Sequence, residues 1–217
     1  QMYDVITFAF DGTLADTAGW FLERLPELAE RHRFHCPAPN ELERLRGCPT
    51  REILAEMRIP AWRLPMIARD LRQIAKRDAE QMRLFSGVQE ALTHLSKRSL
   101  MLAVVSSNAE ENVRTVLGSH APAIAAFACG TSVAGKARLL HRVRIRCDAY
   151  PSRSVYVGDE LRDYAAARSA GLRSALVGWG YGSPAALLRE GPDHFFSRPA
   201  DLASLGRVAA EAVPVLA

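Results

Sequence analysis

From about residue 85 onward the sequence alternates between short apolar runs and longer amphipathic segments, and this pattern leaves few folds open. Strands are expected over residues 99–105, 153–157, 173–177 and about 195–196. Helices are expected over residues 109–117, 136–146, 162–170 and about 200–212. Alternating strands and helices form a parallel, doubly wound α/β sheet, and the ligands of such sheets bind in the crevice beyond the carboxyl ends of the strands.

The first strand of this sheet is predicted at the N-terminus. Residues 3–10 are rich in β-branched and aromatic side chains and end at Asp11-Gly12-Thr13, a turn signal. Between about residues 16 and 84 the apolar residues follow helical spacing instead, as in Phe21, Leu25 and Leu28. We therefore predict an α/β core from residues 1–15 and 85–217, with an all-helical insert of about four helices at residues 16–84.

Four polar signals fall at strand ends or helix starts. They are the run 8–14 around Asp11, Ser106-Ser107-Asn108, Gly135-Lys136, and the run 157–163 with its two aspartates. Each signal alone has a plain structural explanation, because Asp-Gly is a common turn and Ser106 to Asn108 can cap the next helix. Their ordered combination indicates a site.

The residue types suit the hydrolysis of a phosphate ester. Asp11 can act as an acid and then as a base, and Lys136 and Ser106 can neutralise and hydrogen-bond phosphoryl oxygens. The carboxylates of Asp159 and Asp163 are ligands that Mg²⁺ prefers. Phosphate contacts are assigned to the two turns, at Gly12, Thr13, Ser107 and Asn108.

This arrangement resembles the haloacid dehalogenase superfamily, whose first motif reads Asp-x-Asp-Gly-Thr after an apolar strand. The second motif is a Ser or Thr at a strand end, the third a Lys, and the fourth Gly-Asp with another Asp four residues on. The resemblance implies an acid/base role for Asp11, phosphate binding by Ser106 and Lys136, and a helical cap domain. It also implies Mg²⁺ held by Asp159, by Asp11 through its backbone carbonyl, and with support from Asp163.

The chain departs from the family at residue 9, where the resemblance implies a nucleophilic aspartate. Ala9 can neither form an aspartyl-phosphate nor bind Mg²⁺, so the chain as written is expected to be nearly inactive. An engineered substitution is favoured, because the other motif residues are intact. The alternative is a natural protein that binds a phosphorylated ligand or partner without catalysis.

Two features resemble phosphoglycolate phosphatase-like members: the run 178–183, Gly-Trp-Gly-Tyr-Gly-Ser, and the run 157–160 with the alanines on the helix after it. Together with the insert arginines Arg44, Arg46 and Arg51, they favour a small acidic phosphorylated metabolite such as phosphoglycolate.

The overall composition indicates which classes of partner and which cellular compartment to expect. The net charge of +4 is spread along the chain without interleaved aromatics, so no nucleic-acid partner is expected. No apolar stretch reaches the roughly 20 residues of a membrane span. The four cysteines lie far apart, which favours a reducing cytoplasm. The oligomeric state stays open.

Overall fold

The computed structural model describes residues 3–130 and 135–206, and within them six strands form one sheet in which every neighbouring pair is parallel. In order across the sheet the strands are β3 (Ile124–Cys129), β2 (Met101–Ser106), β1 (Val5–Ala9), β4 (Ser154–Gly158), β5 (Arg173–Val177) and β6 (His194–Phe196). The predicted parallel, doubly wound α/β fold is confirmed.

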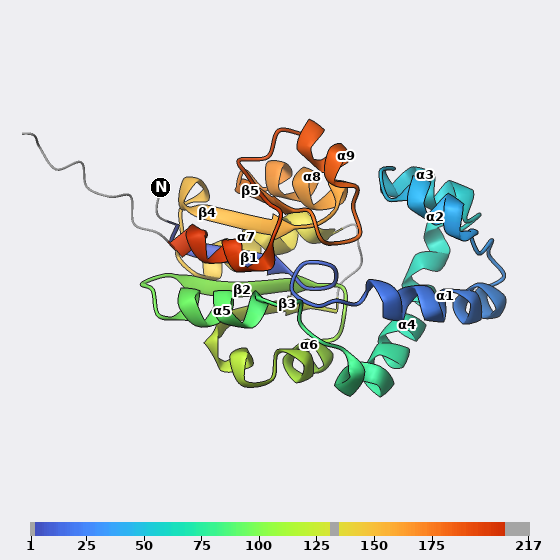
Figure 1. Ribbon diagram of the computed structural model, residues 1–217, viewed down its shortest axis with the longest axis horizontal. Helices are drawn as coiled ribbons and strands as arrows, with labels where there is room; N and C mark the ends of the chain where they lie inside the picture. The colour runs from blue at the N-terminus through green and yellow to red at the C-terminus, as the bar shows by residue number, and fades with distance from the viewer. Residues whose placement is uncertain (1–2, 131–134, 207–217) are drawn as a thin grey trace, which may run out of the picture.

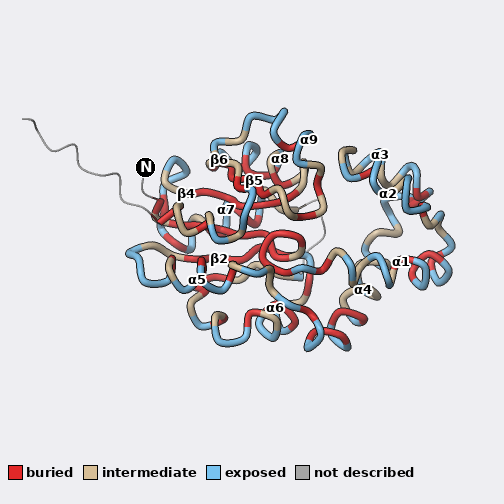
Figure 2. Tube along the Cα trace, viewed as in Figure 1, coloured by how far each residue is buried: buried red, intermediate tan, exposed pale blue. Residues whose placement is uncertain are grey.

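Helices cover both faces of the sheet, and the strands between them are largely buried (Figure 2). On β1, Ile6 and Phe8 pack toward one face, whereas Val5 and Ala9 pack toward the other, as the pleat of a strand requires. The first face carries α5 (Val88–Ser96), α6 (Glu110–Leu117) and the 3₁₀ helix η6 (Pro199–Gly206). The second face carries α7 (Lys136–Arg146) and α8 (Leu161–Ser169). The other core helices that the structure describes are η3 (Gly118–Ala123), η5 (Pro151–Arg153) and α9 (Pro184–Arg189).

The strand order reverses beside β1. The chain first builds β2 and β3 on one side of β1 and then returns to build β4, β5 and β6 on the other. Doubly wound sheets bind their ligands in the crevice at such a reversal, which in this chain falls at the carboxyl ends of β1 and β4.

The inserted helices form a separate group beside the sheet (Figure 1). They are α1 (Ala18–His32), α2 (Pro39–Leu45), α3 (Thr50–Glu56), η1 (Ala61–Arg63), α4 (Leu64–Asp78) and η2 (Ala79–Gln81). The group has its own apolar cluster, in which Leu25, Met57 and Ile59 are buried.

A buried carboxylate ties the two long helices of the insert together. Asp78 at the end of α4 is 3% exposed and accepts hydrogen bonds from Trp20 Nε1 at 2.9 Å and Arg24 Nε at 3.0 Å, both on α1. Arg77 Nε donates a third at 2.7 Å.

The chain crosses between the sheet and the insert at two adjacent segments. Ala15 and Leu84 form an antiparallel bridge. The Asp16 N–H donates to the Arg83 carbonyl and the Phe85 N–H to the Leu14 carbonyl, each at 2.9 Å. The two crossings therefore run as a short paired ribbon.

The structure departs from the expected elements at several points. Strand β3 and helices α5 and α9 were not predicted, and β2 begins two residues later than expected. The predicted closing helix over about 200–212 is the 3₁₀ helix η6 in its described part, and residues 207–212 lie outside the described residues. Of the described helices, none is long and apolar enough to cross a membrane.

Candidate active site

The loop after β1 places Asp11 at the crevice. The Phe10 carbonyl accepts the N–H groups of Thr13 at 3.2 Å, Leu14 at 2.9 Å and Ala15 at 3.0 Å, which closes a tight turn. Gly12 adopts a positive φ of 75° in this turn. A Cβ atom there would lie 2.2 Å from Asp159 Oδ2, so only glycine fits.

Asp11 lies between two hydroxyl groups. Its Oδ1 accepts a hydrogen bond from Thr17 Oγ1 at 3.1 Å, and its Oδ2 lies 3.5 Å from Ser106 Oγ. Burial raises the pKa of the Asp11 carboxyl, although these hydroxyls and the positive charges of Arg162 and Lys136 act in the opposite direction. A carboxyl group whose pKa lies above its ordinary value holds a proton more readily than an exposed aspartate does, which suits a general acid.

The loop after β2 is built by its own polar side chains. Ser106 Oγ accepts the Asn108 N–H at 3.0 Å. Asn108 Oδ1 accepts the Ala109 N–H and the Asn112 amide, each at 2.8 Å, so this buried side chain supports the start of α6. Ser107 is exposed, and its carbonyl accepts a hydrogen bond from Arg72 of the insert at 3.4 Å.

Lys136 opens α7 and is held by Asp163. Lys136 Nζ donates to Asp163 Oδ1 at 2.5 Å, and the Tyr156 hydroxyl donates to the same oxygen at 3.1 Å. Asp163 Oδ2 accepts the N–H groups of Asp159 at 3.0 Å and Glu160 at 3.1 Å. Four donors therefore surround the Asp163 carboxylate, which favours a role in positioning Lys136 over direct metal binding.

Asp159 is buried at the end of β4, with 1% of its surface exposed. Its Oδ1 accepts a hydrogen bond from Thr13 Oγ1 at 2.7 Å, and its Oδ2 accepts the Tyr181 N–H at 2.8 Å. Burial and the charges of Glu160 and Asp163 raise the pKa of Asp159 well above its usual range, and the two hydrogen bonds only partly oppose this.

The charges around Asp159 do not balance. Four carboxylates and two cations interact in this cluster, which leaves two negative charges when all are ionised: Asp11, Asp159, Glu160 and Asp163 against Lys136 and Arg162. A divalent cation would neutralise this excess. Mg²⁺ needs only one or two protein carboxylates, because it keeps several waters, so Asp159 with the Asp11 carbonyl fits it.

Ala9 leaves the donor set one carboxylate short of what the resemblance implies. Ala9 is 4% exposed and belongs to the apolar cluster that β1 shares with α7 and α8. Within residues 3–130 and 135–206, no three His, Cys, Asp or Glu side chains converge to hold a metal ion.

Other residues at the crevice were missed by the sequence reasoning. Thr17 and Tyr181 share a hydrogen bond of 3.0 Å between their hydroxyl groups, and Thr17 in turn reaches Asp11. Tyr181 lies in the run 178–183 that the sequence had marked, but its pairing with Asp159 joins distant segments and leaves no local signal.

The insert arginines differ in how far they are already occupied. Arg44 pairs with Glu56 at 3.0 Å, and Arg46 pairs with Glu43 at 3.1 Å. Arg51 is exposed on α3. Arg44 and Arg46 are therefore poor candidates for binding a substrate carboxylate.

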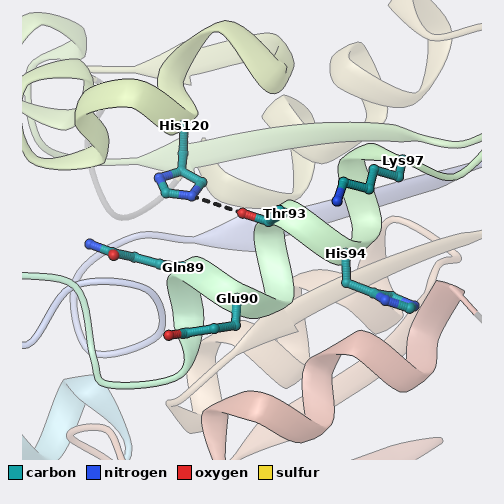
Figure 3. Close-up of a pocket in the computed structure, with 6 residues that line it drawn as sticks. All are labelled: Gln89, Glu90, Thr93, His94, Lys97 and His120. Carbon is teal, nitrogen blue, oxygen red and sulfur yellow. Dashed lines mark hydrogen bonds between the residues drawn. The ribbon is translucent and has the colours of Figure 1, made fainter.

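A shallow groove of about 470 Å³ lies along α5, away from these residues (Figure 3). It is lined by Gln89, Glu90, Thr93, His94, Lys97 and His120. Thr93 and His120 hydrogen-bond to each other across it at 3.1 Å. The groove contains none of the predicted site residues.

The chain belongs to the haloacid dehalogenase-like hydrolase family, which its residues 6–177 match. Within that family it resembles the phosphoglycolate phosphatase-like members, as the sequence predicted. It is 29% identical over 206 residues to a phosphoglycolate phosphatase of Synechococcus elongatus, a match that covers 91% of this chain and 94% of that relative.

A second relative has a different activity. The chain is 27% identical over 183 residues to the tyrosine-protein kinase PtkA of Mycobacterium tuberculosis, a match that covers 82% of this chain and 63% of PtkA.

Solved structures share the fold. A candidate phosphoglycolate phosphatase from Lactobacillus plantarum superposes with a TM-score of 0.78 at 19% identity, over 94% of this chain and 100% of that one. A haloacid dehalogenase-like hydrolase from Streptococcus pneumoniae has a TM-score of 0.77 at 19% identity, over 95% and 99% of the two chains.

Proposed function

We propose that this chain has the site of a Mg²⁺-dependent phosphatase that acts on a small acidic phosphomonoester, with its nucleophile replaced by Ala9. The observation that carries the proposal is the convergence of Asp11, Ser106, Lys136 and Asp159 at the strand ends where the sheet order reverses. The match to the family and to a phosphoglycolate phosphatase supports it.

Each residue has a proposed part in the reaction. Asp11 protonates the leaving alcohol and then accepts a proton from water, since burial keeps its pKa high. Ser106 donates to a phosphoryl oxygen, and Lys136, oriented by Asp163, neutralises another. The amides and hydroxyls of the two turns add phosphate contacts at Gly12, Thr13, Ser107 and Asn108. Mg²⁺, when held by Asp159 and the Asp11 carbonyl, supplies further charge stabilisation, and Asp163 supports that site through the Asp159 N–H.

Ala9 closes the covalent route. Loss of the nucleophile in another hydrolase lowers turnover by about 10⁶, and a comparable loss is expected here. We favour an engineered substitution, because the other residues of the site are present and hydrogen-bonded together. The alternative is a natural protein that binds a phosphorylated ligand and does not hydrolyse it.

The helical insert at residues 16–84 is proposed to act as a cap that sets substrate choice by covering the crevice. Of the three insert arginines that the sequence marked, Arg51 on α3 is exposed and has no ion pair among the described residues, so it is the one proposed to bind a substrate carboxylate such as that of phosphoglycolate. A reducing cytoplasm is the proposed compartment, since the four cysteines are free.

The decisive experiment restores the nucleophile with Ala9→Asp. Phosphate release from an aryl phosphate is measured with Mg²⁺ and with a chelator, and Ala9→Asn serves as the matched control because it has the shape of aspartate without its nucleophilic charge. We expect Ala9→Asp to be at least about a hundredfold more active than the unmodified chain, only with Mg²⁺, and Ala9→Asn to stay inactive. A substrate panel should then show a preference for phosphoglycolate over a neutral sugar phosphate.

If Ala9→Asp restores no turnover, the phosphatase proposal is wrong. Calorimetry of the unmodified chain against the same panel then tests the alternative, for which tight and selective binding of one phosphorylated ligand is the expected result.

A further inference from the structure

One arginine of the insert hydrogen-bonds to the loop between β5 and α9, at residues 180–182. Arg46, directly after α2, donates from Nε to the Tyr181 carbonyl at 2.9 Å. Its Nη2 lies 3.3 Å from the Gly180 carbonyl and 3.4 Å from the Gly182 carbonyl. The Arg46 carbonyl in turn accepts the Ser183 N–H at 3.0 Å. A planar guanidinium with several fixed donors is suited to hold successive carbonyls in this way.

The amide side of the same loop holds Asp159. The Tyr181 N–H donates to Asp159 Oδ2 at 2.8 Å, and the Gly182 N–H donates to the Asp159 carbonyl at 3.1 Å. Two peptide units therefore carry Arg46 on their carbonyl side and Asp159 on their amide side.

Loop 180–182 is packed tightly against the Gly12 turn and Asp159. A Cβ atom on Gly180 would lie 2.3 Å from the Gly12 carbonyl oxygen and 2.4 Å from Asp159 Oδ2. One on Gly182 would lie 2.3 Å from the Asp159 carbonyl oxygen. Because the loop backbone is in direct contact with both the Gly12 turn and Asp159, a displacement of the loop displaces the Asp159 carboxylate.

Arg46 has little capacity left for a substrate. Its Nη1 pairs with Glu43, and its Nε and Nη2 are used by the loop carbonyls. Because these contacts join the insert to the core, they break if the insert moves away from loop 180–182.

We infer that Arg46 is a positioning residue that couples closure of the cap to the metal site, by holding loop 180–182 where its amides fix Asp159. The inference rests on the proposed function, since it assigns Mg²⁺ to Asp159. When the cap opens, Arg46 leaves the loop, Asp159 loses its fixed orientation, and Mg²⁺ binds more weakly. Metal binding and cap closure thus favour each other.

The test compares Arg46→Ala and Arg46→Lys with Arg44→Ala, two positions earlier, whose guanidinium pairs with Glu56 and contacts no loop carbonyl. Three quantities are measured: Mg²⁺ affinity by calorimetry, amide hydrogen exchange of residues 178–183, and the affinity of inorganic phosphate in the presence of a chelator. We expect Arg46→Ala to weaken Mg²⁺ binding roughly tenfold, as loss of an outer contact to a metal ligand does. Exchange in 178–183 should rise, while phosphate affinity, which depends on Ser106 and Lys136, should change less than about twofold.

The Mg²⁺ affinity of Arg46→Lys should lie between those of Arg46→Ala and the unmodified chain, because one ammonium group cannot hold three carbonyls. Arg44→Ala should bind Mg²⁺ as the unmodified chain does. Unchanged Mg²⁺ affinity in Arg46→Ala would overturn the inference, as would parallel losses of Mg²⁺ and phosphate affinity, which would indicate general loosening. If the unmodified chain and its Ala9→Asp form both fail to bind Mg²⁺, the proposed metal site itself is wrong. In that case the hydrogen-exchange measurement tests the role of Arg46 by itself, and unchanged exchange of residues 178–183 in Arg46→Ala would overturn it.

Discussion

Asp163→Asn should destabilise the chain strongly, because no placement of the asparagine amide satisfies the groups around it. The Asp163 side chain is 1% exposed, and each of its two oxygens accepts hydrogen bonds from two donors. If the amide nitrogen takes the Oδ1 position, it faces Lys136 and Tyr156; in the Oδ2 position it faces two backbone N–H groups. In the second placement two buried backbone N–H groups lose their acceptor, in the first Lys136 loses its acceptor, and in both Lys136, whose side chain is 16% exposed, loses its counter-charge.

The expected magnitude follows from these losses. Removing one partner of a buried ion pair costs about 3–5 kcal/mol. Relief of the repulsion between Asp163 and Asp159 offsets part of this cost, so a net loss near the lower end, about 3 kcal/mol, is expected. For a chain of this size that corresponds to a fall in melting temperature of about 10 °C.

The assay is urea and thermal unfolding at pH 7, with Asp201→Asn as the matched control. Asp201 pairs with Arg198, whose side chain is 78% exposed, so its replacement should change stability by less than about 0.5 kcal/mol. A loss below about 1 kcal/mol for Asp163→Asn would refute the reasoning, because it would mean that the four donors find other acceptors.

Two further changes test the insert and the turn after β1. The Arg77 guanidinium, together with the two α1 donors, holds the pKa of Asp78 well below its usual range. The stabilisation by this carboxylate is therefore complete above its unfolded pKa of about 3.9 and is lost as the pH falls below that value. Asp78→Asn should lower the free energy of unfolding by about 2 kcal/mol at pH 7 and by progressively less below pH 4. A difference in urea unfolding that does not change with pH would contradict this. Gly12→Ala should lower both the melting temperature and the Mg²⁺ affinity. The control Gly171→Ala has a similar φ of 70° and no atom within 4 Å of the added Cβ, so it should lower the melting temperature only by the cost of backbone strain. Equal effects of the two changes would mean that contact with Asp159 is unimportant.

The sheet could be predicted largely from its hydrophobic runs, and the exceptions have physical causes. β5 and α7 match the predicted bounds, since each is flanked by clear turn signals. β3 reads Ile-Ala-Ala-Phe-Ala-Cys, and its alanines have little preference for strands, so only its pairing with β2 identifies it. The closing segment over 200–212 had helical spacing, but its described part forms a 3₁₀ helix, η6, packed against α5.

The site was predictable wherever a residue type follows a strand directly. Asp11, Ser106 and Asp159 all lie at the expected strand ends, and Lys136 opens α7. What the sequence could not indicate is which partner each side chain meets. The bonds of Asp163 to Lys136 and of Asp159 to Tyr181 span 27 and 22 residues, and no local pattern encodes them. The metal role of Asp163 and the phosphate role of Asn108 stay predictions, since both side chains are occupied by protein donors.

The paired ribbon at Ala15 and Leu84 makes the insert a module. Because the entering and leaving segments are hydrogen-bonded side by side, the chain leaves and re-enters the core at two neighbouring backbone points, as it would for a tight hairpin. The entropy of joining those points depends only weakly on the length of chain between them. A helical group of another size or shape, or a short turn in its place, could therefore be exchanged at this ribbon without changing the strand register. If the insert sets substrate choice as proposed, substrate preference can change in this way while the sheet and its polar strand ends stay the same.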